Sequence, residues 1–255
     1  MNNNRLDKRN YENLIYALKS KNYIFCKFSV LPKASSLTPY VLLRHDVDFS
    51  LQAALELASF EHQVNVQSTY FVHLRSEIYN PISYDGIKLI SEISSLGHDI
   101  ALHVTYQDDL NDLSAEVVKQ IEILKKYCSY LNSGIVSFHR PGIKAKELLD
   151  YSLPKGTLHT YQKRFFLDTS YYSDSGGSWK YGNPIESDDY KNKKNMQILI
   201  HPFWWLEEGD TPLQKLSSYL SRNPSITADL IQKSVISYPI NSIQEARRAL
   251  LEPKL

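Results

Sequence analysis

The sequence predicts an α/β protein built as a single (β/α) barrel. Short apolar runs rich in β-branched residues alternate with segments of helical period, which indicates a parallel sheet with helical crossovers. The length of 255 residues is also close to the ~250 residues typical of one such barrel. One domain is therefore expected over residues 1–255, with a helix and strand extension in residues 1–40.

Each element of this barrel has its own signal. Helices are predicted where apolar residues recur every three or four positions, and strands where β-branched and aromatic residues form short runs. Gly97 ends one helix, and a turn at residues 132–134 closes another. The long segment 153–194 is rich in Tyr, Ser, Gly and Asp and has little periodicity, so it is expected to form functional loops. In order, the elements are helix 11–18, extended segment 23–28, strand 41–43, helix 51–60, strand 68–74, helix 87–96, strand 100–104, a helix from Ser114 through Leu124, strand 135–138, strand 196–200 and strand 235–238.

Composition excludes several classes of protein. Apolar residues make up 42% of the chain and the formal net charge is +1, which is typical of a globular protein and offers no basic surface for nucleic acid. No apolar run approaches the roughly 18 residues of a membrane span, and the polar start of the chain lacks the apolar core of a signal peptide. Cys26 and Cys128 lie far apart, so no disulfide framework is expected. A cytoplasmic protein is predicted, and its oligomeric state is left open.

Four apolar runs end in an acid or a histidine. VLL is followed by RHDVD, and three further runs end at His103, His139 and His201. Because the carboxyl ends of barrel strands converge on one face, these side chains are expected to meet in one pocket. Imidazole and carboxylate groups are ligands for Zn²⁺ and related divalent ions. A single histidine at a strand end is more often structural, but four such coincidences favour a metal site.

Asp46 and Asp48 are expected on the same face of their strand, because side chains alternate between the two faces. Near a cation, two such carboxylates can divide the work, one binding the metal and the other accepting a proton. The alternative is structural, since an Asp-x-Asp sequence after a strand can also cap the next helix.

The motifs RHDVD, GHDIALH, FHRPG and HPFWW, in this order, resemble those of the polysaccharide deacetylase family, also called NodB-homology proteins or family-four carbohydrate esterases. The resemblance is to a variant branch and covers about residues 41–205. It implies an irregular or incomplete barrel of seven strands. It also assigns Asp46 as the catalytic base, Asp48 as a metal ligand and His103 as the first metal-binding histidine, and it gives His98 a structural role.

The second metal-binding histidine of the family falls four residues after the first, and this chain has Gln107 at that position. Either another ligand replaces it, for which His139 is the best candidate, or metal binding is weakened.

The resemblance assigns the remaining site residues. Arg140 would hold the catalytic Asp, a task for which a guanidinium is suited because it can grip a carboxylate through two hydrogen bonds. The DSGGSW segment would contribute Asp174 to the catalytic site, and His201 would be the general acid. Flat faces for a sugar ring would come from Trp179, Trp204 and Trp205, although packing in the core is the more common role of each alone.

The resemblance therefore implies a hydrolase that uses a divalent metal ion, expected to be Zn, to remove an acetyl group from an N-acetylated sugar. A cytoplasmic setting favours a carbohydrate precursor such as a nucleotide sugar, in the biosynthesis of a surface polysaccharide such as lipopolysaccharide. Two alternatives stay open. One is a hydrolase of another C–N or ester bond on the same fold. The other is an inactive glycan-binding relative, which Gln107 favours and the retained acids, Arg140 and His201 oppose.

Overall fold

The computed structural model describes residues 5–30, 38–106 and 109–222. The chain divides into two compact units, Met1–Leu206 and Glu207–Leu255, so the expectation of one domain over residues 1–255 stays a prediction. In the described part of the second unit, Arg222 forms an ion pair with Glu207. The strand predicted over 235–238 lies outside the described residues.

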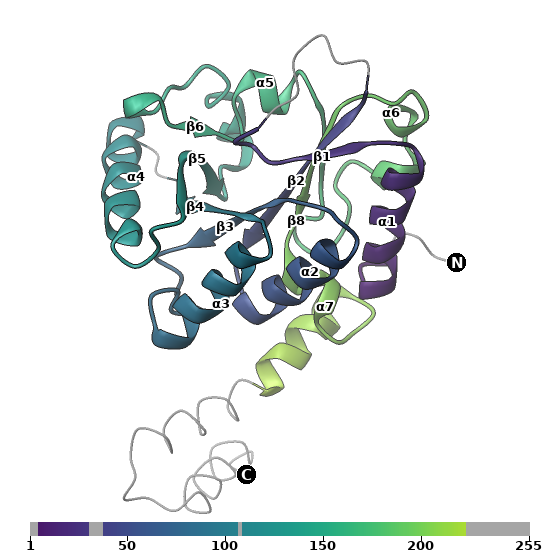
Figure 1. Cartoon of the computed structure of the whole chain (residues 1–255), viewed down its shortest axis with the longest axis horizontal. Helices are drawn as coiled ribbons and strands as arrows, with labels where there is room; N and C mark the ends of the chain where they lie inside the picture. Colours follow the sequence, from purple (N-terminus) through teal and green to yellow (C-terminus); the bar gives the residue numbers. More distant parts are fainter. Residues whose placement is uncertain (1–4, 31–37, 107–108, 223–255) are drawn as a thin grey trace, which may run out of the picture. The chain divides into compact units, whose positions relative to one another are not determined.

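The first unit is built around one parallel sheet (Figure 1). Seven strands follow one another in the order β6-β5-β4-β3-β2-β8-β7, and β1 pairs with β2 beside this path. Every ladder between described strands is parallel, and none joins β6 to β7. The sheet is therefore an incomplete barrel, and the predicted fold class is confirmed. The strands are β1 (Ile24–Cys26), β2 (Tyr40–Val47), β3 (Thr69–His73), β4 (Asp99–Thr105), β5 (Leu131–His139), β6 (Leu158–His159), β7 (Ser170–Ser173) and β8 (Met196–Ile200).

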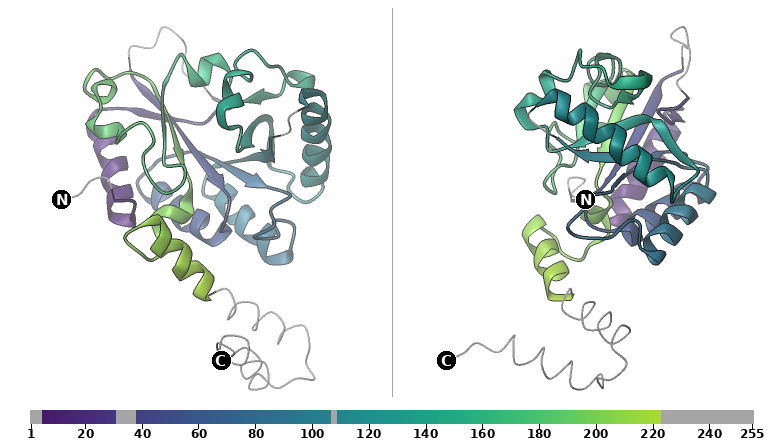
Figure 2. Two further views of the ribbon diagram at one scale, coloured as in Figure 1. Left: turned by 180° about the vertical axis from the view of Figure 1, so that it is seen from behind. Right: turned by 90° about the vertical axis from the view of Figure 1, so that its left-hand side faces the viewer.

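The four long helices that the structure describes in the first unit lie on the outside of this sheet (Figure 1), and Figure 2 shows the same arrangement from behind and from the side. Asp7, Ser50 and Ser83 begin the first three helices, each accepting a hydrogen bond from the backbone N–H three residues later. Among the described residues, no helix is long and apolar enough to cross a membrane. The helices are α1 (Lys8–Ser20), α2 (Leu51–Gln63), α3 (Tyr84–Ser95), α4 (Leu110–Lys125), and the short α5 (Lys163–Phe166), α6 (Asp188–Lys191) and α7 (Pro202–Leu206), with 3-10 turns η1 (Gly142–Lys146), η2 (Pro154–Gly156) and η3 (Pro184–Glu186).

The alternation of side chains along each strand separates two apolar cores. Tyr70 and Val72 of β3 belong to the outer core, which lies between the sheet and helices α2, α3 and α4. Phe71, between them, points into the barrel. The inner core takes one or two residues from each strand it touches, and its members are Cys26, Phe28, Leu42, Phe71, Ala101, Ile135 and Phe165. Residues an even number of positions further along these strands therefore point into the barrel at its carboxyl end.

The segment 153–194 contains more regular structure than its sequence predicts. It holds strands β6 and β7 as well as α5, α6 and two 3-10 turns, so the prediction of loops alone is wrong. The two strands have two and four residues, which is too short for an alternating pattern to be recognised. Within the helix and strand predicted for residues 1–40, β1 pairs with β2 and so belongs to the sheet.

Candidate metal centre

The inner faces of four neighbouring strands place acids and histidines together at the carboxyl end of the barrel. In β4 and β5, His103 is opposite Ser137 and Thr105 is opposite His139. Asp48 directly follows β2, on the same side as Asp46. The structure thus brings together one atom each of Asp48, His103 and His139, all within 4.8 Å of one another.

These three ligand atoms form a nearly equilateral triangle. Asp48 Oδ1 lies 3.3 Å from His103 Nε2 and 3.3 Å from His139 Nδ1, and the two nitrogens are 3.2 Å apart. In a tetrahedral zinc site with bonds of about 2.0–2.1 Å, two ligand atoms lie about 3.3–3.4 Å apart. Asp48 Oδ1 is also buried without a hydrogen-bond partner among the described residues. A divalent cation fits this set of donors, because it would satisfy a buried oxygen that is otherwise without a partner.

Asp46 lies beside the triangle and is held as an anion. Arg44 Nε and Nη2 donate hydrogen bonds to its two oxygens at 2.9 and 2.6 Å, and both side chains are buried. Burial alone would raise the pKa of Asp46, but the charge of Arg44 holds that pKa below its ordinary value. Asp46 Oδ2 is 3.8 Å from His103 Nε2. A proton acceptor therefore stands next to the position that an ion would take.

The arginine that holds Asp46 is not the predicted one. Arg140 follows β5 with an exposed side chain and a positive φ of 57°. No ion pair links Arg140 to Asp46 in the part of the chain that the structure describes, so the prediction that Arg140 grips this acid is wrong. Arg44 takes this place because it lies two residues before Asp46 and points to the same side of β2.

His201 also lies beside the triangle, with its Nε2 3.7 Å from Asp48 Oδ2. Its Nδ1 is 2.5 Å from Asp174 Oδ1, and its backbone N–H donates to Asp174 Oδ2 at 2.9 Å. Trp205 Nε1 donates to the same Oδ2 at 2.7 Å. Burial would lower the pKa of His201, but the buried charge of Asp174 outweighs it and raises that pKa to about 9. A protonated imidazole oriented by a carboxylate is suited to act as a general acid.

Two of the three predicted sugar-binding tryptophans are in the core. Trp204 is 7% exposed and Trp205 is 2% exposed, so the prediction that they offer open faces to a sugar ring is wrong. Trp205 packs edge-on against Tyr11 and against Trp179, which is partly exposed. The role of Trp205 in the site is its hydrogen bond to Asp174.

His73 is a site residue that the sequence reasoning missed. It is the last residue of β3, opposite His103, and its ring centroid is 5.2 Å from that of His139. Its Nε2 is 2.9 Å from Thr105 Oγ1, and burial lowers its pKa to about 4, so the ring is neutral. The signal was available, because the apolar run before it also ends in a histidine. Gln107 lies outside the described residues.

A second group of buried polar side chains lies on the outer face of the sheet, which the helices cover, and its role is structural. Glu61 of α2 accepts hydrogen bonds from Tyr11 and from Ser68, and its Oε1 is 2.7 Å from His45 Nε2. Burial raises the pKa of Glu61, but the adjacent imidazole of His45 and then that of His98 bring it down to about 2. His98 Nδ1 accepts a hydrogen bond from the backbone N–H of Ser68, and its Nε2 lies 3.0 Å from a backbone carbonyl. The structural role predicted for His98 is confirmed.

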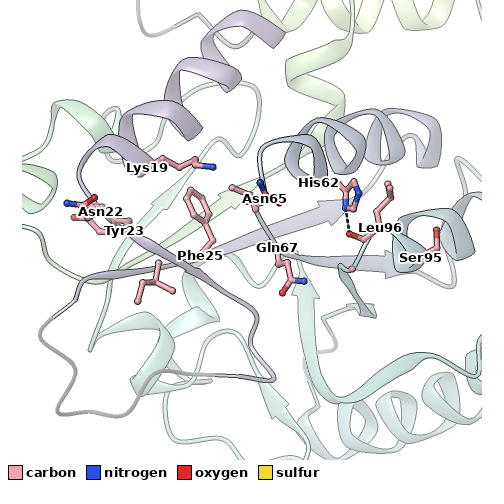
Figure 3. A pocket seen from close by; sticks show the side chains of 12 residues that line it. Lys19, Asn22, Tyr23, Phe25, His62, Asn65, Gln67, Ser95 and Leu96 are labelled. Carbon is pink, nitrogen blue, oxygen red and sulfur yellow. Dashed lines mark hydrogen bonds between the residues drawn. The ribbon is translucent and has the colours of Figure 1, made fainter.

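A separate cavity lies elsewhere on the first unit (Figure 3). It has a volume of about 780 Å³ and is lined by residues at the ends of α1, α2 and α3 and before β3 and β4, among them Lys19, His62, Asn65, Gln67 and Leu96. This is the amino end of the sheet, whereas ligands of parallel α/β sheets bind at the carboxyl end. The cavity is therefore separate from the candidate metal centre.

Comparisons with known proteins give distant similarities to solved structures, among them a deacetylase and an aldolase. No model of a protein family matches the chain, and no curated protein matches it. A chitin deacetylase from the fungal pathogen Colletotrichum lindemuthianum is similar in structure over 71% of this chain and 81% of that one, with 16% identity and a TM-score of 0.36. Phospho-2-dehydro-3-deoxyheptonate aldolase from Thermotoga maritima is similar over 75% of this chain and 61% of that one, with 12% identity and a TM-score of 0.27. Because both TM-scores are low, functional interpretation depends on the geometry of the site itself.

Proposed function

We propose that this protein is a metal-dependent hydrolase that removes an acetyl group from an N-acetylated sugar. The observation that carries the proposal is the triangle of Asp48, His103 and His139, with an anionic carboxylate near His103 and a charged imidazole near Asp48. The hydrolytic chemistry follows from this arrangement. The acetyl group and the sugar follow from the resemblance of the motifs, and zinc follows from the donor set and its spacing.

Each residue has a defined task in this proposal. A divalent ion held by Asp48, His103 and His139 would supply Lewis acidity toward the oxygen of the acyl group. Asp46, kept anionic by Arg44, accepts a proton from water as the water oxygen forms a bond to the acyl carbon. His201 donates a proton to the nitrogen as the C–N bond breaks. The proton gained by Asp46 balances the one lost by His201, and the products are an amine and acetic acid, which ionises to acetate by losing its proton to the solvent.

Metal content is the first test of the proposal. We expect about one equivalent of a divalent metal in the purified protein, as in other three-ligand catalytic sites, and its loss in the Asp48→Ala, His103→Ala and His139→Ala variants. His62→Ala is the matched control, because His62 is an exposed histidine at the opposite end of the sheet. Absence of metal in the parent protein, even after metal is supplied, would exclude the hydrolytic proposal.

Acetate release is the second test. The parent protein should release acetate from N-acetylated sugars and lose this activity with a chelator. The Asp46→Asn variant should keep its metal, but its rate of acetate release should fall by a factor of about 10²–10⁴, the usual contribution of a catalytic base. If metal is bound but no N-acetyl sugar is cleaved, the proposed substrate class is wrong, and esters and other compounds with a C–N bond are the next substrates to test. If sugars bind to a metal-free protein without turnover, the protein is a glycan-binding relative and not an enzyme.

A further inference from the structure

Ser137 connects two parts of the candidate metal centre. It lies on the inner face of β5, opposite His103 in the register, and it is fully buried. Its Oγ is 2.6 Å from His103 Nδ1 and 3.2 Å from Asp46 Oδ1. A single hydroxyl therefore bridges the base and one of the metal-ligating histidines.

The ion pair between Arg44 and Asp46 determines which atom donates each hydrogen bond in this bridge. Asp46 receives two hydrogen bonds from Arg44, so it is ionised and can only accept. The hydroxyl hydrogen of Ser137 therefore points to Asp46, and its oxygen is left to accept a hydrogen bond. The donor on that side is His103 Nδ1, which must therefore carry a hydrogen.

In a neutral imidazole, which is the form that binds a metal ion, a hydrogen on Nδ1 leaves His103 Nε2 without one. That nitrogen faces Asp48 Oδ1 and His139 Nδ1 across the triangle. A lone pair at Nε2 is what a metal ligand requires, and a hydrogen bond to the other ring nitrogen is the usual means by which a protein selects that tautomer.

We propose that Ser137 is a positioning residue that fixes His103 in the Nδ1–H tautomer, and so prepares Nε2 to bind the metal. The inference deepens the proposed function and rests on its metal site. Removal of the hydroxyl would leave His103 free to rotate or to carry its hydrogen on Nε2, where it would oppose a cation.

The chain offers a closely matched control in Ser68. Its hydroxyl is also fully buried between a carboxylate and an imidazole, with Oγ 2.6 Å from Glu61 Oε2 and 3.0 Å from His98 Nδ1. There, however, the imidazole Nδ1 accepts from a backbone N–H, so His98 carries its hydrogen on Nε2. Ser68 and the triangle lie on opposite faces of the sheet. Removing the Ser68 hydroxyl therefore removes the same kind of hydrogen bonds and leaves the metal centre unchanged.

The experiment compares the full-length protein with Ser137→Ala and Ser68→Ala. Zn²⁺ affinity is measured by competition with a chromogenic chelator, and folding of each variant is checked by urea denaturation. We expect Ser137→Ala to bind Zn²⁺ about 10–100-fold more weakly, the usual effect of losing a partner of a metal-ligating histidine. Ser68→Ala should lose stability and keep the parent affinity. Equal Zn²⁺ affinity in Ser137→Ala and the parent would overturn the inference.

A second measurement tests the tautomer in the parent protein itself and needs no variant. Long-range ¹H–¹⁵N NMR correlations of the metal-free protein distinguish a hydrogen on Nδ1 from one on Nε2. We expect the two histidines to differ, with His103 in the Nδ1–H form and His98 in the Nε2–H form. His103 in the Nε2–H form would overturn the inference even if Zn²⁺ binds. A parent protein that binds no Zn²⁺ but shows the expected tautomers would count against the proposed function and support the role of Ser137 in setting the tautomer.

Discussion

The buried ion pair between Arg44 and Asp46 gives the sharpest test of how the site is held. Arg44 is fully buried, gives Asp46 two hydrogen bonds, and has its guanidinium carbon 5.0 Å from the ring centre of Tyr161. In Arg44→Met, a side chain of similar length fills the space between aromatic rings, but Asp46 keeps its charge in a buried position. Breaking a buried pair by removing one partner typically costs about 3–5 kcal/mol. We expect a loss of that size in the free energy of unfolding.

Arg140→Met is the matched control, because the substitution is the same and Arg140 is exposed. Its effect should stay within about 0.5 kcal/mol, as for other surface positions. Urea denaturation followed by circular dichroism measures the change in the free energy of unfolding of both variants. The comparison is valid if the slope of that free energy against urea concentration is the same in each variant as in the parent. In the double variant Arg44→Met with Asp46→Leu, no unpaired charge is left, so its cost should be smaller than the sum of the two single costs. The reasoning would be refuted if Arg44→Met cost less than about 1 kcal/mol, or if Arg140→Met cost as much as Arg44→Met.

Two further predictions concern the buried acids Glu61 and Asp174. The pKa of Glu61, about 2 against an ordinary 4.5, means that Glu61 stabilises the fold above pH 4.5 and that this stabilisation, about 3 kcal/mol at most, is lost as the pH falls toward 2. Glu61→Gln should therefore flatten the loss of stability between pH 4.5 and 2 in acid denaturation, and an unchanged slope would contradict this. Asp174→Asn should keep the metal content of the parent while acetate release falls about 100-fold, because His201 loses the charge that keeps it protonated. Loss of metal in Asp174→Asn would instead make Asp174 part of the metal site.

The convergence of the site could be predicted because it depends on the strand period alone. Apolar runs that end in Asp48, His103 and His139 were recognisable as strands, and parallel strands bring their carboxyl ends to one edge. The same period also predicts which side chain lies beside Asp46. Arg44 is two residues before Asp46, so both must lie on one face, and the sequence RHD already holds the buried ion pair.

Other features depend on packing between distant segments and could not be predicted from local patterns. Trp204 and Trp205 follow the last strand in a short helix, and whether their faces are open depends on α1 and on Phe49, which cover them. Strands β6 and β7 are short, and they are recognisable only from their pairing with β5 and β8. Ser137 is an ordinary serine in an apolar strand, and its role becomes visible only when β4 and β5 are aligned.

The register of β4 and β5 also explains how three ligands can be assembled although the chain has Gln107 where a second histidine is expected. His139 is opposite Thr105, so it lies two residues beyond the level of His103 along the barrel axis. From there its Nδ1 reaches within 3.2 Å of His103 Nε2, so β5 supplies a nitrogen in place of the histidine that the motif leads one to expect at position 107. A ligand on a strand is held by the backbone ladder, as His139 is through its pairing with Thr105 of β4. The departure from the expected motif is therefore compatible with a complete metal site.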